Sequence, residues 1–218
     1  MCGIAGLIHR GKSSNVGSEL QQMLQALKHR GPDSTGYALY ADNDGKNFIM
    51  RFKVGENVGE GSTSVNEDAS VYDKRKKLVD QMLLDLSAKV VKDEQLTPYS
   101  FRYEMEYNGD LMEFSKKIES IDSVEILSIG KSLELIKDLG DAAAVSDRYG
   151  LGDVKGTHGI GHARMATESG VDIKSAHPFW GYPFSDVSVV HNGQLTNYWN
   201  NRRVLENKGM RFMSECDS

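Results

Sequence analysis

The sequence predicts an α+β fold, and the prediction depends on local patterns of apolar and polar residues. Residues 99–107 alternate without a break between apolar and polar side chains, which indicates a half-buried strand. Residues 20–27 place apolar side chains at intervals of three and four, which indicates an amphipathic helix. The apolar run at 3–8 contains Gly3 and Gly6, which is typical of a strand that other backbone approaches closely.

The composition excludes several classes of protein. Of the 218 residues, 39% are hydrophobic and 26% are charged, as in ordinary globular domains. The net charge of −5 argues against a nucleic-acid partner, which would require a basic surface. The chain has no transmembrane run and no signal peptide, because the apolar stretch at 3–8 is too short and no basic segment precedes it. We therefore expect a cytoplasmic protein with one large domain, or one domain with a sizeable insertion.

The N-terminal part of the chain predicts a strand, a helix and a hairpin. After the strand at 3–8, Ser18 to Gln21 has the pattern of a capping box, and the helix that it opens should end before Gly31 and Pro32. A rigid loop at 29–36 follows. The next two strands are expected to pair as a hairpin across 42–46, and they are 37–41 and 47–54.

The composition changes near residue 55, where a stretch rich in Gly, Ser, Glu and Asn at 55–70 predicts a linker or loop. The segment beyond it alternates between helix and strand patterns. The expected elements are a helix at 71–91, a strand at 99–107, a helix at 110–119, a strand at 123–129 and a helix at 133–139. We interpret 55–155 as a small α+β subdomain inserted into a main domain made of 1–54 and 156–218. From 156 onward strands and loops return, and a last helix is expected at 196–208.

The two cysteines, Cys2 and Cys216, lie near the two ends of the chain. Two cysteines do not make a disulfide framework, although a single end-to-end pair stays open. Removal of Met1 would give Cys2 a free α-amino group with a pKa of about 7.7 to 8.0, beside a thiol with a pKa of about 8.5. The amine could then accept the thiol proton, which makes a nucleophile with its own base. An incidental cysteine in a frayed terminus is the alternative.

His158 and His162 are four residues apart, the spacing of two metal ligands on a helix. Gly159 and Gly161 disfavour a helix, and on a strand the same spacing is about 13 Å, too far for one ion. We therefore predict no metal site here.

Several short motifs occur in a fixed order along the chain. They are M-C-G-I-A-G at 1–6, R-G-P-D-S-T-G at 30–36, G-H-A-R-M-A-T at 161–167, A-H-P at 176–178, H-N-G at 191–193 and S-E-C-D-S at 214–218. Together they resemble the class II, or N-terminal-nucleophile (Ntn), glutamine amidotransferase domain. With the long insertion, they are most similar to the stand-alone amidotransferase subunit of archaeal-type glutamate synthases. The resemblance covers 1–54 and 156–218 and implies an Ntn-hydrolase αββα sandwich of two antiparallel sheets.

The resemblance also implies the chemistry. Cys2 would attack the side-chain amide of glutamine and form a glutamyl thioester, releasing ammonia for an acceptor on a partner subunit or domain. The side-chain amide of Asn192 and the backbone N–H of Gly193 would bind the oxyanion, where preorganised donors stabilise the transition state most. No cofactor and no metal are implied.

Four further residues are assigned to the substrate by the resemblance, and one supports the nucleophile. Arg164 would bind the α-carboxylate of glutamine, since a guanidinium fits two carboxylate oxygens, and Asp217 would bind the α-ammonium group. Thr167 and His177 would shape the pocket, and Arg30 would brace the strand of the nucleophile.

Each of these residues also has a plain structural interpretation. Arg164 could form a surface ion pair, Asp217 could begin a helix, and Asn192-Gly193 is a strong type I′ hairpin turn. Two other functions stay open as well: an Ntn-type hydrolase of another amide, and a non-catalytic glutamine-binding or regulatory module.

Members of the family continue beyond the aspartate motif into strands that complete both sheets, whereas this sequence stops at Ser218. A sheet without its closing strands exposes open edges. We therefore expect the 218-residue chain alone to hydrolyse glutamine weakly or not at all.

Overall fold

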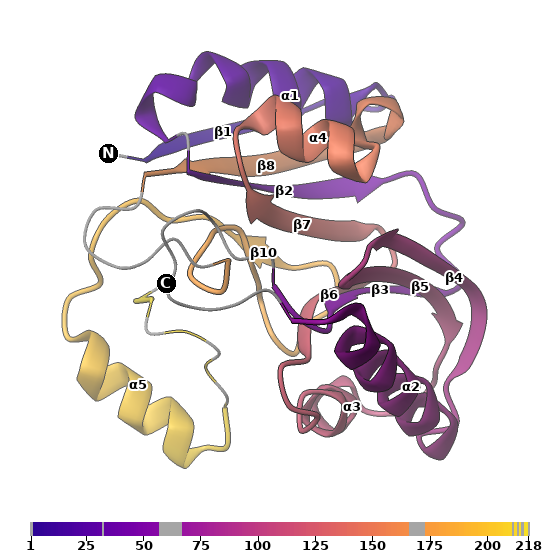
Figure 1. Ribbon diagram of the computed structural model, residues 1–218. Helices are drawn as coiled ribbons and strands as arrows, with labels where there is room; N and C mark the ends of the chain where they lie inside the picture. The colour runs from indigo at the N-terminus through magenta and orange to yellow at the C-terminus, as the bar shows by residue number, and fades with distance from the viewer. Residues whose placement is uncertain are drawn as a thin grey trace.

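Two four-stranded antiparallel sheets form the centre of the molecule, and each carries helices on its outer face (Figure 1). The computed structural model describes residues 2–31, 33–56, 67–165 and 173–210, together with Phe212, Ser214, Cys216 and Asp217. The layers run from helices through two sheets to helices, which confirms the α+β prediction and is compatible with the sandwich.

The first sheet has the strand order β1-β8-β2-β7. Its strands are β1 (Gly3–Ile8), β8 (Gly156–Arg164), β2 (Ser34–Ala41) and β7 (Leu133–Leu139). Helices α1 (Val16–Ala26) and α4 (Ala142–Tyr149) cover its outer face (Figure 1). Short 3₁₀ turns, η1 (Lys28–Arg30) and η2 (Leu151–Asp153), follow these two helices.

The second sheet has the order β4-β5-β3-β6. Its strands are β4 (Lys89–Thr97), β5 (Ser100–Glu106), β3 (Phe48–Lys53) and β6 (Glu125–Gly130). Helices α2 (Ala69–Asp85) and α3 (Leu111–Ile118) cover its outer face. The alternation predicted for 99–107 is observed, because Phe101, Tyr103 and Met105 are fully buried against these helices.

The last part of the chain lies beside the sheets. It contains the short hairpin of β9 (Phe179–Trp180) and β10 (Ser188–Val189), followed by α5 (Tyr198–Asn207). Figure 1 shows α5 away from the faces of both sheets, and none of its residues is buried.

Asp186 attaches this hairpin to the rest of the fold. Its carboxylate accepts the backbone N–H groups of Lys131, Ser132 and Leu133 at 3.0, 2.7 and 2.8 Å, which lie in and after the turn between β6 and β7. Burial alone would raise the pKa of Asp186, but these three donors outweigh it and lower the pKa.

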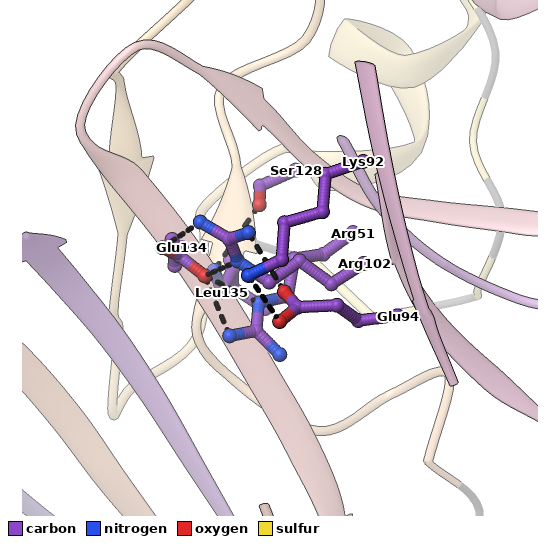
Figure 2. Close-up of polar contacts among 7 residues, drawn as sticks. All are labelled: Arg51, Lys92, Glu94, Arg102, Ser128, Glu134 and Leu135. Carbon is purple, nitrogen blue, oxygen red and sulfur yellow. Dashed lines mark hydrogen bonds and ion pairs between the residues drawn. The ribbon is translucent and has the colours of Figure 1, made fainter. Parts of the chain in front are cut away.

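A chain of buried ion pairs lies between the two sheets (Figure 2). Glu134 of β7 accepts from Arg51 of β3 at 2.5 and 2.8 Å and from Arg102 of β5 at 2.9 and 3.0 Å. Arg102 also bonds to Glu94, which pairs with Lys92. Burial would raise the pKa of Glu134, but the two guanidinium groups outweigh it and lower the pKa to about 2.

A second buried ion cluster lies nearby, with Glu125 of β6 between Lys53 of β3 and Lys137 of β7 at 3.0 and 3.2 Å. These three side chains are at most 7% exposed. The two sheets are therefore joined by paired charges as well as by the apolar cluster of Ala38, Leu127, Leu133 and Leu135.

Several predicted elements are confirmed. The strand at 3–8 has the predicted bounds, and the ends are shifted by a few residues in the strands at 99–107 and 123–129 and in the helices at 110–119 and 196–208. The helix predicted from the capping box is also present, but α1 begins earlier, after Asn15. The Ser18 hydroxyl donates to the Asn15 carbonyl at 3.1 Å instead of capping the helix.

Three sequence predictions about secondary structure are wrong. The segment 133–139 is the strand β7 and not a helix, because Leu133 and Leu135 face the other sheet while Ile136 packs under α1 and α4. The helix predicted at 71–91 ends at Asp85, and the positive φ of Ser87 turns the chain into β4. The stretches 37–41 and 47–54 are strands but do not form a hairpin, since β2 joins the first sheet and β3 the second.

The pairing of strands crosses the boundaries predicted for the inserted segment. β3 belongs to the predicted main domain but pairs with β5 and β6, while β7 belongs to the predicted insertion but pairs with β2. Of the linker predicted at 55–70, residues 57–66 lie outside the described part of the chain. No helix among the described residues combines the length and the apolar character needed to cross a membrane.

Candidate active site

Cys2 lies immediately before β1, at the edge of the first sheet. It is half-buried, and its thiol is not in a disulfide. β1 pairs antiparallel with β8, with Gly3 opposite Ala163. Continuing that register by one residue places Cys2 opposite Arg164 at the end of β8.

Gly3 lets this edge strand approach the end of α1. A Cβ atom at Gly3 would stand 3.0 Å from the Cβ of Leu27, closer than side chains usually allow. A side chain at Gly3 would therefore require Leu27 or the strand after Cys2 to shift by a few tenths of an ångström.

The segment 191–195 brings the two ends of the chain together. The side-chain amide of Asn192 donates to the carbonyl oxygen of Cys2 at 3.1 Å. The carboxylate of Asp217 accepts the backbone N–H of Leu195. Gly193 lies between them, and a Cβ there would stand 2.8 Å from Nε2 of His191. Asn192 is therefore in contact with Cys2, and Asp217 bonds to Leu195, two residues after Gly193.

Asn192-Gly193 is not the turn of a β-hairpin. β10 ends at Val189 and α5 begins at Tyr198, and the described residues between them form no strand. The plain hairpin interpretation of this dipeptide is therefore wrong.

His177 is buried and anchors the same segment from the opposite side. Its Nδ1 accepts the backbone N–H of His191 at 3.2 Å, and its Nε2 lies 3.5 Å from Sγ of Cys216. Its ring packs against His162 and Phe179, with centroids 4.9 and 4.5 Å apart.

His177 and His162 are held in the neutral form. Burial, followed by the nearby charges of His162, Lys137, His191 and Arg164, lowers the pKa of His177 to about 3. Burial and the charge of Arg164 lower the pKa of His162 to about 4. The guanidinium of Arg164 is therefore close enough to act on both rings. Nδ1 of His162 is buried and has no hydrogen-bond partner within the described ranges.

The backbone of the loop after Arg30 approaches the end of β8 at Arg164. The carbonyl of Arg164 accepts the N–H of Asp33 at 3.1 Å. A Cβ on Gly31 would stand 2.4 Å from the backbone of Ala163, so a glycine is needed where the residue after Arg30 crosses β8. Thr167, predicted to line the substrate pocket, lies outside the described residues.

His158 and His162 both lie on β8 but have different surroundings. The ring of His158 stacks on Tyr40 with centroids 3.9 Å apart, whereas His162 faces His177. Among the residues that the structure describes, no group of three or more His, Cys, Asp or Glu side chains could hold a metal ion.

The contacts of His177 with His191, His162 and Cys216 were not predicted from the sequence. His191 and Cys216 directly precede the predicted site residues Asn192 and Asp217, so the motifs themselves contained a signal. Their contacts with His177 have no local pattern, because they join positions 14 and 39 residues apart.

No protein-family model matches the chain. It is 39% identical to a protein of Methanothermobacter thermautotrophicus whose name assigns it to the glutamine amidotransferases, over all of this chain and 69% of that protein. It is 30% identical to the glutamine amidotransferase-like protein GlxB of Rhizobium meliloti, over all of this chain and 67% of that protein.

A partial match joins the chain to larger enzymes. It is 35% identical to the isomerizing glutamine–fructose-6-phosphate aminotransferase of Methanococcus maripaludis, over 50% of this chain and 18% of that enzyme. Taken with the two matches over the whole of this chain, this shows that the chain belongs to the glutamine amidotransferase family and is of the class II type.

Proposed function

We propose that this chain is the glutaminase component of a glutamate synthase-like enzyme. It would release ammonia from the side-chain amide of glutamine and deliver it to an acceptor on a partner subunit. The observation that supports this most directly is the hydrogen bond from Asn192 to Cys2, which joins the predicted oxyanion donor to the predicted nucleophile. The membership of the family supports glutamine as the substrate.

Cys2 is the proposed nucleophile. With Met1 removed, its α-amine accepts the thiol proton as Sγ forms a bond to the amide carbon of glutamine. The tetrahedral intermediate then collapses, the C–N bond breaks, and the proton on the amine passes to the leaving ammonia. Water hydrolyses the thioester, which releases glutamate and restores the thiol.

Asn192 and Gly193 are the proposed oxyanion donors. A side-chain amide has two N–H groups. One of them bonds to the Cys2 carbonyl at 3.1 Å and orients the amide, which leaves the other to bind the oxyanion together with the Gly193 N–H. Donors fixed in advance need no reorganisation during the reaction, and each is worth about 2.7 to 4 kcal/mol.

The two charges of the amino acid would be bound by two side chains of opposite charge. Arg164 takes the α-carboxylate and Asp217 the α-ammonium group, while Thr167 limits the pocket and Arg30 supports the strand of Cys2. The segment 55–155 is proposed as the part that distinguishes this chain from other amidotransferases, with a role in contacts to the partner.

Labelling with an electrophilic analogue of glutamine tests the proposal. A diazoketone analogue should add to the chain once and at Cys2, because only that thiol would lie beside the bound analogue. Cys216 provides the matched control: Cys216→Ser should still be labelled at residue 2, and Cys2→Ser should lose the label. An adduct at Cys216 in the unsubstituted protein would overturn the mechanism.

The intact mass of the purified chain tests whether the α-amine of Cys2 can act as the base. The mechanism requires a free α-amine on Cys2, so the mass should correspond to loss of Met1. A retained Met1 in a protein that hydrolyses glutamine would exclude the α-amine as the base. Binding of glutamine without labelling or turnover would instead favour a non-catalytic glutamine-binding module.

A further inference from the structure

His177 is hydrogen-bonded in a way that defines where its proton lies. Nδ1 accepts the backbone N–H of His191 at 3.2 Å, so it carries no hydrogen. In the neutral ring the proton is therefore on Nε2, which points at Sγ of Cys216 at 3.5 Å. The ring thus connects the H-N-G segment on one side to the S-E-C segment on the other.

The ring itself is held in place by its surroundings. His177 is 6% exposed and packs between His162 and Phe179. Its backbone lies directly on β2, since a Cβ on Gly36 would stand 2.0 Å from the His177 carbonyl oxygen. His177 is therefore held in a fixed position against β2 of the first sheet.

The segment that it holds is, by contrast, exposed. Asn192, Gly193 and the residues up to Asn197 are all exposed, and they belong to no strand or helix. The His191 N–H bonded to His177 is one residue before Asn192, which reaches Cys2. Exposed backbone positions its donors accurately only where buried groups anchor it.

We infer that His177 is a positioning residue for the oxyanion donors, acting through Nδ1 as a neutral hydrogen-bond acceptor for His191. This inference rests on the proposed function and adds to it. If His177 only lined the glutamine pocket, its loss would weaken the binding of substrate and transition state alike. If His177 positions the oxyanion donors, its loss weakens the binding of the transition state selectively.

Two substitutions separate these roles. In His177→Asn, the amide oxygen can occupy the position of Nδ1 and accept from His191. In His177→Gln, the amide lies one bond further out, near the position of Nε2, and leaves the His191 N–H without its acceptor. His9→Gln is the matched control, because His9 bonds to Glu19 on α1 and is not part of the site.

The readout is the binding of two glutamine analogues. The aldehyde analogue forms a bond from Cys2 Sγ to its carbonyl carbon, and the thiol proton moves to the α-amine as the carbonyl oxygen becomes an oxyanion. Its affinity therefore reports on the oxyanion donors, whereas that of glutamate reports on ground-state binding. We expect His177→Gln to weaken aldehyde binding about tenfold or more, with glutamate binding little changed. His177→Asn should restore most of the loss.

Other results would overturn the inference. Equal weakening of both ligands would make His177 a wall of the pocket, and equal losses in His177→Asn and His177→Gln would show that the Nδ1 acceptor is irrelevant. If an unsubstituted chain that binds glutamate forms no aldehyde adduct at Cys2 by mass spectrometry, the proposed function fails and the inference falls with it.

Hydrogen exchange tests the inference on the unsubstituted chain, so the result does not depend on whether a variant folds. The His191 amide of the unsubstituted chain should exchange much more slowly than the neighbouring amides of the exposed segment 192–197, apart from that of Leu195, which is bonded to Asp217. Exchange at the rate of its neighbours would show that His177 does not hold it.

Discussion

Asp217 accepts the backbone N–H of Leu195, and the proposed mechanism also assigns to it the α-ammonium group of glutamine. A carboxylate can serve both, since its two oxygens offer about four acceptor positions. The same side chain would thus hold the segment that carries the oxyanion donors and recognise the substrate.

Asp217→Asn separates these two roles, because the amide keeps an acceptor oxygen for Leu195 but loses the charge. We expect KM for glutamine to rise about 10-fold or more, with kcat changed less, as removal of a ground-state ion pair predicts. Steady-state kinetics measures both values. A loss confined to kcat would show that Asp217 does not bind the substrate. Asp153→Asn, on η2 and away from the site, is the control.

At this scale the motifs predicted which residues gather around Cys2, and the structure shows Asn192 and Asp217 beside that segment. Their catalytic roles stay predictions. The hydrogen bonds of His177 could not be predicted, because they depend on how the segment after β8 and the segment after α5 meet in space.

Asp186 shows how one side chain connects two elements of the fold. Its carboxylate is surrounded by the N–H groups at the β6–β7 turn, so it holds the β9–β10 hairpin on the turn. The hairpin in turn leads to the segment 191–195, and the Asp186 contact therefore lies between the sheets and the candidate site.

Asp186→Ala should lower the free energy of unfolding by about 1 kcal/mol or more at pH 7, since partly buried backbone donors lose their acceptor. The pKa of Asp186 is lowered in the folded protein, so its contribution is present above the unfolded pKa of about 3.9 and is lost as pH falls below that value. Denaturant unfolding at pH 7 and pH 3 measures the difference, which should be smaller at pH 3. A difference independent of pH would contradict the charged interaction.

At the scale of elements, the sequence predicted strands best where alternation was long, as in β5, where Phe101, Tyr103 and Met105 pack on the helices. The prediction of secondary structure failed at β7. Its seven residues have apolar side chains at 133, 136 and 139, a spacing that fits a helix as well as a strand. The sequence also did not predict that β2 and β3 lie in different sheets. A short connection is normally a sign of a hairpin, and only the tertiary structure separates the two strands.

Across the whole molecule, the two sheets are joined through Glu134, which is bonded to arginines of β3 and β5. A buried pair that loses one partner leaves an uncompensated charge, which destabilises by about 3 to 5 kcal/mol. Replacing both partners of such a pair is less harmful than replacing one.

Glu134→Gln should therefore lower the free energy of unfolding by about 3 kcal/mol or more at pH 7. Glu94→Gln, at the 33% exposed end of the same chain of ion pairs, should lower it by about 0 to 1 kcal/mol. The folded pKa of Glu134 is about 2, below its unfolded value of about 4.3, so its contribution is complete above pH 4.3 and declines as pH approaches 2. Equal effects of the two substitutions in chemical denaturation would contradict this assignment.

The bond between Asn192 and Cys2 joins positions 190 residues apart in the chain. Closing so large a loop is slow compared with forming local structure, so the site should assemble late in folding. On a ribosome that adds about 5 to 20 residues per second, Asn192 is synthesised roughly 10 to 40 s after Cys2. The nascent chain thus carries an unassembled thiol at its leading end throughout that interval, and the candidate site forms only after the segment 191–217 has left the ribosome.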